Sequence, residues 1–312
     1  VLECSIGVRS DTWVDASGVD WGDPSGPGPF GSGSPVEGDG VYVYPWVGFT
    51  PLPPPAEPAP AAVPEPDCKR VMFLGARGSG QAPVGSGDDA AYGDWQDGMG
   101  PEVWSVYQAF QQQLRAYRPN LAEETLEKGI GLRYQAEPVP WPNVLLSGEF
   151  MASVFTGASR INQYVEDEMQ QCPDQRYVLA GYSQGALAVH IYLNKYASSA
   201  ELDRIASVVL VSDPAKNAFG NETLFMDGLS SPTPGMVGAI GVYTRGNGAW
   251  GGPLPSSVTD RTNAICHDND FVCAPGWGSG FSQHTNYTQS EMAGMGNLAA
   301  VETAALLPQD DA

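Results

Sequence analysis

Long apolar runs and basic residues are both scarce in this sequence. No apolar stretch of the 312-residue chain approaches the length of about 18 residues that a membrane-spanning helix needs. Lysine and arginine number 15 against 36 acids, which gives a net charge of −21. Because phosphate binding requires clustered Lys and Arg, this balance argues against a nucleic-acid partner. It also disfavours adhesion to anionic lipid, and it favours solubility with little self-association.

Histidine and cysteine are too sparse to suggest a metal site. The chain has three histidines and five cysteines, and no Cys-x-x-Cys pair occurs. This cysteine usage fits an oxidising, extracytoplasmic setting. Cys266 and Cys273 are close enough in sequence to close a small loop, and Cys68 and Cys172 each precede a predicted strand, which leaves Cys4 as the odd cysteine.

No secretory leader is visible in the first residues of the sequence. Val1 to Ser10 contains a glutamate and no long apolar stretch. Two expectations stay open: a leader has been removed, or the protein leaves its cell by another route. We expect an extracellular protein, with association with a virus particle as the alternative.

A proline-rich run separates two compositions. Residues 51–66, PLPPPAEPAPAAVPEP, are half proline and predict a semi-rigid linker in extended polyproline II. Residues 1–50 are rich in glycine, proline and acid, with one strand-like run at Val41–Val47. We expect them to form a small extension or attachment module, followed by one larger domain over residues 67–312.

Strand-like and helix-like stretches alternate from Cys68 onward. Apolar runs predict strands at Arg70–Gly75, Leu132–Ala136, Arg176–Ala180 and Ile205–Val211. Periodicity predicts helices at Glu102–Tyr117, Glu149–Gln171, Gln184–Tyr196 and around Glu291–Leu307. This alternation predicts an α/β fold with a mostly parallel central sheet flanked by helices.

The motif GYSQG, Gly181 to Gly185, joins one of these strands to a helix. A residue on such a turn lies at the carboxyl edge of the sheet, where open α/β folds bind ligands. The flanking glycines are needed because the strained turn leaves no room for Cβ atoms. The helix that follows directs N–H groups at developing negative charge. Ser183 is therefore a candidate nucleophile, and an ordinary glycine turn is the alternative.

A serine nucleophile needs a base. His190 follows Ser183 on the same predicted helix, about 10 Å along its axis, which is too far for a hydrogen bond. We expect His190 to be a structural or surface residue. His267 lies inside the Cys266–Cys273 loop, where it could pack or be exposed. His284 fits the chain order serine, acid, histidine, provided that the acid precedes it.

The residue types and their spacing do not identify the acid that would orient the histidine. The competing aspartates between Ser183 and His284 are Asp203, Asp213, Asp227, Asp260, Asp268 and Asp270. Asp268 and Asp270 lie in CHDNDFVC, where a disulfide would hold an acid accurately enough to orient an imidazole. The alternative is a stapled surface loop with solvated acids.

Four blocks in order resemble the cutinase family of α/β-hydrolase serine esterases: CKRVMFLGARGSG, CPDQRYVLAGYSQGALA, ICHDNDFVCAPG and Gln283-His284-x-x-Tyr287. The resemblance covers roughly residues 67–307 and implies a cutinase-like catalytic domain of the α/β-hydrolase fold. It implies no metal and no organic cofactor. The site residues that it implies are the triad Ser183, Asp270 and His284, the oxyanion-hole residues Ser79 and Gln184, and the disulfides Cys68–Cys172 and Cys266–Cys273.

The resemblance implies a carboxylic-ester hydrolase that acts through an acyl-enzyme on lipid, polyester or cell-envelope esters. One alternative is a phage-particle or cell-surface attachment protein, joined through residues 1–66, whose esterase body attacks a mycolyl-type envelope. Another is a binding module with a vestigial triad. The Gly/Pro-rich stretch Asp213–Thr262 departs from compact family members and could cover the cleft. Mycolyl-ester-cleaving phage endolysins place a long insertion between acid and base, whereas Asp270 and His284 are only 14 residues apart.

Overall fold

The structure is a computed structural model of the 312-residue chain. It describes residues 8–9, 14–16, 19–22, 32–34, 36–37, 41–42, 68–81, 98–119, 126–139, 148–216, 223–224, 235, 252–275 and 280–307. The chain divides into two units, the smaller made of Val1–Pro54 with Pro140–Ala152 and the larger of Pro55–Val139 with Ser153–Ala312. The domain bounds expected from the sequence stay a prediction.

The smaller unit contains short parallel strand pairs. They join β1 (Val8–Arg9) to β3 (Val36–Glu37) and β2 (Val14–Asp15) to β4 (Val41–Tyr42). Trp21 is buried, and its carbonyl accepts a hydrogen bond from Ser34 N at 2.8 Å. β4 covers the start of the strand predicted at Val41–Val47, and the rest of that run lies outside the described residues, as does Cys4.

The larger unit is built on a six-stranded parallel sheet with the order β6-β5-β7-β8-β10-β9. The strands are β5 (Val71–Ala76), β6 (Glu127–Gly131), β7 (Arg176–Tyr182), β8 (Ile205–Val211), β9 (Thr223–Leu224) and β10 (Thr262–Ile265). The central strands β5, β7 and β8 are buried almost throughout, as expected of a parallel sheet covered on both faces. The predicted α/β fold is confirmed.

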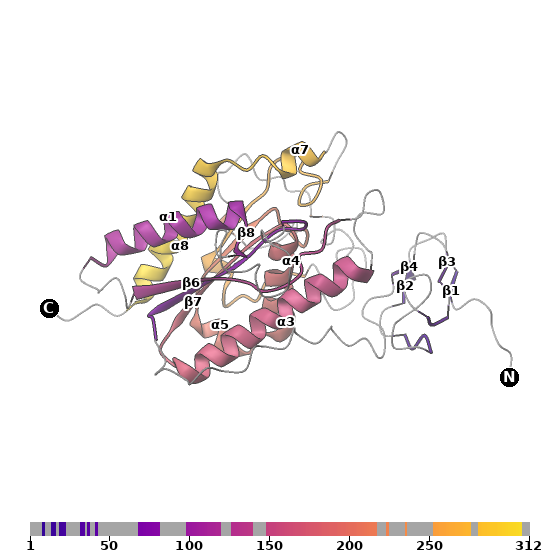
Figure 1. Cartoon of the computed structure of the whole chain (residues 1–312), viewed down its shortest axis with the longest axis horizontal. Helices are drawn as coiled ribbons and strands as arrows, with labels where there is room; N and C mark the ends of the chain where they lie inside the picture. The colour runs from indigo at the N-terminus through magenta and orange to yellow at the C-terminus, as the bar shows by residue number, and fades with distance from the viewer. Residues whose placement is uncertain are drawn as a thin grey trace. The chain divides into compact units, whose positions relative to one another are not determined.

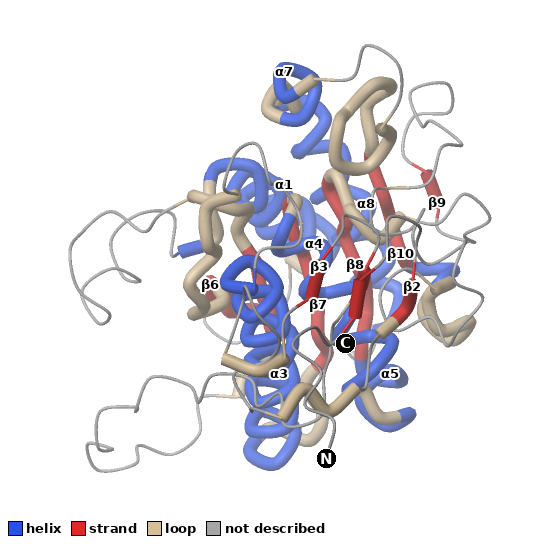
Figure 2. The backbone as a smooth tube through the Cα atoms, turned by 90° about the vertical axis from the view of Figure 1, so that its right-hand side faces the viewer, coloured by secondary structure: helices blue, strands red, loops and turns tan. Residues whose placement is uncertain are grey.

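Helices cover both faces of this sheet (Figures 1 and 2). In Figure 1, α1 (Pro101–Tyr117) and α8 (Gln289–Leu306) lie on one side, and α3 (Gly148–Gln171) and α5 (Ser199–Arg204) lie on the other. The helix α4 (Gln184–Ile191) packs beside α3, since a Cβ added to Gly157 would lie 3.0 Å from Ala188 Cβ. None of the helices in the described part of the chain is long and apolar enough to cross a membrane.

The packing of α1 against α8 and the sheet forms much of the core. Val103, Val106, Phe110 and Leu114 recur every three or four residues on one face of α1 and are buried. Burial of each such side chain contributes about 1.5–3 kcal/mol. Gly296 on α8 allows the close approach, because a Cβ there would clash with the Val106 carbonyl oxygen.

The strand predicted at Leu132–Ala136 was wrong. The edge strand beside β5 is β6, Glu127–Gly131, and the chain leaves the sheet after it. The guanidinium of Arg77 donates to the carbonyls of Leu132 and Gln135, both at 3.2 Å, and also to that of Tyr134. These residues do alternate between buried and exposed, but their carbonyls accept hydrogen bonds from a side chain in place of a strand ladder.

The other elements predicted from Cys68 onward agree with the structure to within two residues, apart from one helix end. The helix predicted at Gln184–Tyr196 is α-helical only to Ile191 and continues as a π-helical turn, η2 (Tyr192–Tyr196). The sequence did not predict β9, β10, α5, the 3₁₀ turn η3 (Thr259–Arg261) or α7 (Phe281–His284). Of these, β10 and α7 matter for function, because they lead to two of the candidate site residues.

Candidate active site

Ser183 occupies a strained turn between β7 and α4. Its φ is 53° and its ψ is −115°, and its N–H donates to the Val211 carbonyl at 2.9 Å. A Cβ on Gly181 would meet backbone atoms of Gly185. A Cβ on Gly185 would clash with the carbonyl of Ala76 on the neighbouring strand. Both positions therefore require glycine because there is no room for a Cβ atom, as expected from the sequence motif.

The three predicted triad side chains come together at the carboxyl edge of the sheet. Ser183 Oγ lies 3.0 Å from His284 Nε2, and His284 Nδ1 lies 3.1 and 3.2 Å from the two carboxylate oxygens of Asp270. Asp270 is fully buried, while Ser183 and His284 are 6% and 7% exposed. These distances match those of a nucleophile, a base and an acid that orients the base.

The Asp270 carboxylate is surrounded by donors. Oδ2 accepts hydrogen bonds from Ser212 Oγ at 2.6 Å and Tyr287 OH at 2.7 Å, and Oδ1 accepts one from Val272 N at 2.8 Å. Burial by itself raises the pKa of Asp270, but the hydrogen bonds and charge of His284, with the hydrogen bonds of Ser212 and Tyr287, hold it below its ordinary value. The carboxylate is therefore ionised beside the imidazole.

Both disulfides implied by the resemblance are present, joining Cys68 to Cys172 and Cys266 to Cys273. The second closes the short loop that carries Asp270, whose carbonyl accepts a hydrogen bond from Ala274 N at 2.9 Å. Asp268, two residues earlier, is exposed. The loop thus separates the two competing acids by their burial.

The remaining aspartates that competed as the acid lie elsewhere. Asp203 is exposed, and so is the Asp260 side chain, at 76%. Asp213 is buried but belongs to another pair, and Asp227 lies outside the described residues. Among the described candidates, only Asp270 contacts His284.

The His284 ring is held by aromatic neighbours. The ring of Tyr182, the tyrosine of GYSQG, stacks on it with centroids 5.2 Å apart, and Tyr182 OH donates to the His284 carbonyl at 2.7 Å. No role was predicted for Tyr182 from the sequence. Its place beside the serine was the only available signal.

The two other histidines have other partners. His190 is fully buried, so the surface alternative is wrong: its Nδ1 lies 2.7 Å from Asp213 Oδ2 and its Nε2 lies 3.0 Å from the Gly252 carbonyl. His267 Nε2 lies 2.8 Å from Glu291 Oε1. Neither ring is placed to take a proton from Ser183.

The two residues expected to form an oxyanion hole follow the ends of two adjacent strands, β5 and β7. Gln184 is the first residue of α4, where the N–H groups have no intrahelical acceptor. Ser79 follows β5, whose last residue, Ala76, pairs with Gly181 of β7. The Ser79 hydroxyl donates to the Glu137 carbonyl, which ties its loop to the segment after β6. The role of both residues stays a prediction.

Ser212 and Tyr287 were not assigned roles from the sequence, although both contact Asp270. Tyr287 was part of a quoted motif. Burial and the Asp270 charge raise the pKa of Tyr287 well above its ordinary value, so its hydroxyl stays a donor. For Ser212 the only signal was its place directly after a predicted strand.

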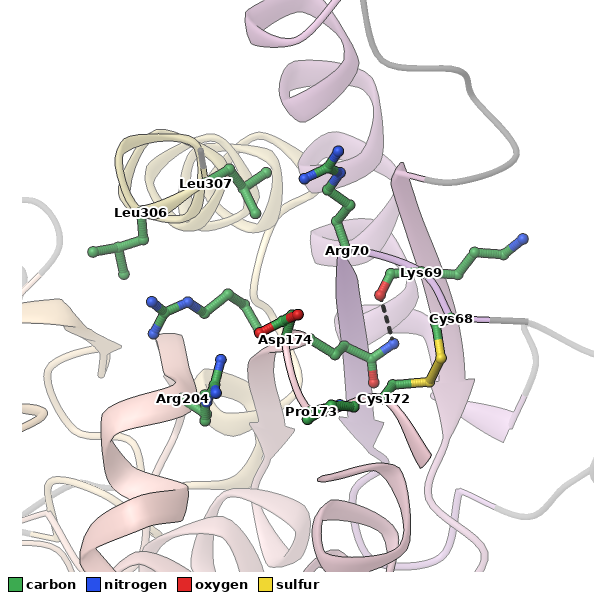
Figure 3. A pocket seen from close by; sticks show the side chains of 11 residues that line it. Cys68, Lys69, Arg70, Cys172, Pro173, Asp174, Arg204, Leu306 and Leu307 are labelled. Atoms are coloured by element: carbon green, nitrogen blue, oxygen red, sulfur yellow. Dashed lines mark hydrogen bonds between the residues drawn. A yellow bond between two sulfur atoms is a disulfide. The ribbon is translucent and has the colours of Figure 1, made fainter. Parts of the chain in front are cut away.

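A pocket of about 650 Å³ lies away from this site, at the amino-terminal ends of β5 and β7 (Figure 3). The Cys68–Cys172 disulfide, the basic residues Lys69, Arg70 and Arg204, and Leu307 form part of its lining. No triad residue lines it. Since Ser183 lies at the opposite ends of the strands, this pocket is not the catalytic cleft.

Comparison with known proteins agrees with the geometry. The family model described as Cutinase matches residues 101–298, more than half of the chain. Carboxylesterase Culp1 of Mycobacterium tuberculosis is 28% identical over 150 residues, which are 48% of this chain and 57% of that protein. A cutinase of Hypocrea jecorina is 27% identical over 157 residues, 49% of this chain and 47% of that protein. The chain thus spans about half the length of these curated relatives.

A solved structure shows the same fold. A cutinase-like protein from Cryptococcus sp. superposes with a TM-score of 0.53 at 20% identity, over 78% of this chain and 98% of that one. The fold, the family match and the arrangement of the site lead to one assignment: the chain belongs to the cutinase family.

Proposed function

We propose that this protein is a serine carboxylic-ester hydrolase that acts through an acyl-enzyme. The observation that carries the proposal is the chain of contacts from Ser183 Oγ to His284 Nε2, at 3.0 Å, and from His284 Nδ1 to Asp270, at 3.1 Å. It is built on a turn whose strained geometry presents the serine. Membership of a family with relatives named carboxylesterase and cutinase supports the same reaction class.

The chemistry follows from these positions. Ser183 Oγ attacks the ester carbonyl carbon while its proton passes to His284 Nε2, and Asp270 stabilises the resulting imidazolium. The carbonyl–oxygen bond to the alcohol then breaks, and His284 returns the proton to the departing alcohol. Water repeats the sequence, giving its proton to His284 and releasing the acid from Ser183.

We propose that Ser79 and the N–H of Gln184 bind the oxyanion that forms on the ester carbonyl. Both lie at the carboxyl ends of adjacent strands, and the start of α4 adds the favourable end of the helix dipole. One such donor contributes about 2.7–4 kcal/mol in related chemistry. The enzyme needs no metal or organic cofactor for this sequence of steps.

The substrate is proposed to be a lipid, polyester or cell-envelope ester with an apolar acyl side. We propose an extracellular site of action, because two disulfides in one domain persist best in an oxidising compartment. Residues 1–66 are proposed to act as an attachment module and spacer, since a proline-rich run follows the acidic N-terminal segment.

The alternatives are less well supported. A vestigial triad would not need to retain a buried, hydrogen-bonded acid, base and serine. A protein whose main role is attachment is not favoured by a family match that falls on residues 101–298, outside the N-terminal segment.

A chain-length series of p-nitrophenyl esters tests the proposal, with an envelope glycolipid and a polyester alongside. We expect hydrolysis by the wild type and a loss of about 10⁴-fold or more in Ser183→Ala. Ser198→Ala is a matched control, because Ser198 caps α5 and has no role in the site. Equal hydrolysis by wild type and Ser183→Ala would refute the assignment.

A further inference from the structure

Ser212 lies directly after β8, between the strand of the nucleophile and the strand that leads to the acid. Its neighbour Val211 pairs with Tyr182 on β7 and with Ile265 on β10. The N–H of Ser212 donates to the Ile265 carbonyl at 2.9 Å, and the residue is fully buried. Backbone bonding on both sides therefore fixes its position.

The Ser212 hydroxyl contacts both members of the His284–Asp270 pair. Its Oγ lies 2.8 Å from His284 Nδ1, closer than either Asp270 oxygen, and 2.6 Å from Asp270 Oδ2. A hydroxyl has one proton, and its donation to an ionised carboxylate gives the stronger, charge-assisted hydrogen bond. The Oγ lone pair is then left to accept the proton on Nδ1.

We propose that Ser212 is a positioning residue for ester hydrolysis: it accepts the Nδ1 proton of His284, donates its own to Asp270, and so holds the imidazole for Ser183. The inference rests on the proposed function. It fixes the tautomer whose Nε2 carries a lone pair, and only that tautomer takes a proton from the serine.

The backbone at Ser212 supports a role for its side chain. Its φ of 52° is a conformation that glycine adopts more readily than serine. Of the four non-glycine residues with positive φ in the described part of the chain, Ser183, Ser212 and Asn269 belong to the site or adjoin it. Strain of this kind is common where function requires a side chain. Glycine would relieve the strain but would lack the hydroxyl.

Asp270 keeps other donors without Ser212. Tyr287 OH and Val272 N still bond to it, at 2.7 and 2.8 Å. Removal of the Ser212 hydroxyl therefore leaves a buried carboxylate that still accepts hydrogen bonds, and it deletes the shortest of the contacts to His284 Nδ1. Because Ser212 touches Nδ1 and not the nitrogen that faces Ser183, we expect the change in kcat and not in KM.

The test uses the full chain with Ser212→Ala, Ser212→Gly and the control Ser207→Ala. Ser207 is also a fully buried serine on β8 that donates to a carboxylate, Glu302 Oε2, at 2.6 Å. The measurements are kcat and KM on a small p-nitrophenyl ester, the melting temperature, and ¹⁵N-histidine NMR of the Nδ1 and Nε2 signals.

Both Ser212 variants should lose about 10–100-fold in kcat, with KM within about twofold, as expected for a misplaced catalytic group. Their His284 ¹⁵N signals should move toward a mixture of tautomers, while Ser207→Ala changes only the melting temperature. Folded Ser212 variants with wild-type kcat and an unchanged tautomer would overturn the inference alone. A wild type that hydrolyses no ester in the series would overturn the proposed function and the inference with it.

Discussion

His190 Nδ1 lies 2.7 Å from Asp213 Oδ2, so the chain contains a second buried histidine–aspartate pair in addition to His284 and Asp270. The two pairs differ at the other ring nitrogen. Nε2 of His284 faces the Ser183 hydroxyl at 3.0 Å, whereas Nε2 of His190 meets the Gly252 carbonyl at the same distance. The first arrangement is the one that our proposal uses for proton transfer from Ser183, and the second joins α4 to the chain after β8.

This difference predicts opposite effects of two substitutions. His284→Ala should abolish ester turnover with little change in the melting temperature, because Asp270 keeps Tyr287 OH and Val272 N as hydrogen-bond donors. His190→Ala should keep turnover within a few-fold and lower the free energy of unfolding by about 1–3 kcal/mol, because Asp213 loses a buried partner. Ester assays and denaturant titrations measure both effects. An active His284→Ala protein beside a folded but inactive His190→Ala protein would reverse the assignment of the base.

A second prediction concerns acid stability. Burial alone raises the pKa of Asp270, but the hydrogen bonds and charge around this carboxylate hold the pKa below the ordinary value of 3.8. A lowered folded-state pKa stabilises the protein above pH of about 4 and ceases to do so as pH falls through the folded value. The difference in unfolding free energy between wild type and Asp270→Asn should therefore shrink as pH falls below about 4. Urea titrations from neutral to acidic pH measure it, and a difference that grows toward low pH would show the opposite shift.

The disulfides should have separable effects. Loss of Cys266–Cys273, by replacing both cysteines with serine, should reduce kcat more than stability, because the short loop positions Asp270. Loss of Cys68–Cys172, which spans 104 residues, should reduce the free energy of unfolding by about 4–5 kcal/mol in the chain-entropy model. Denaturant titration and ester assays on both double variants give the comparison. We expect the first double variant to lose more kcat and the second to lose more unfolding free energy, and one variant showing the larger loss in both measurements would contradict this prediction.

The N-terminal segment supplies a further prediction. Residues 1–66 contain no histidine, and no proposed site residue lies in them. A chain that starts near Glu65 and retains Cys68 should keep its turnover on small soluble esters within a few-fold. It should lose activity only on a surface-bound substrate, because tethering acts through effective concentration. A large fall in both melting temperature and small-ester rate would refute the independent-module proposal.

Local patterns were sufficient to predict the fold and to single out Ser183, whereas Asp270 was implied only by the resemblance to the cutinase family. The apolar run before GYSQG specifies a strand, and the glycines are required by space that the structure shows to be occupied. The strand at Leu132–Ala136 was predicted wrongly because the side chain of Arg77, 55 residues away, takes the Leu132 carbonyl. A hydrogen-bond partner this far away in the sequence cannot be predicted from the local pattern of apolar and polar residues.

Contacts between residues that are distant in sequence were also what local patterns could not predict at the candidate site. Asp268 and Asp270 lie in the same short loop, so their place in the sequence does not separate them; the resemblance implied Asp270, and in the structure Asp270 is buried and contacts His284, whereas Asp268 is exposed. Ser212 was missed because its importance comes from the order of strands, which places the end of β8 between β7 and β10. Sheet order is a tertiary property, and a buried serine after a strand has no sequence signature of its own.

The most direct test of the central claim is the mass of the protein after reaction with a fluorophosphonate, followed by peptide mapping. An activated serine is phosphonylated through displacement of fluoride, whereas an ordinary hydroxyl does not react. We expect one adduct per chain, located on Ser183, and no adduct in Ser183→Ala or after unfolding. An unlabelled wild-type protein, or an adduct on a serine other than Ser183, would contradict it.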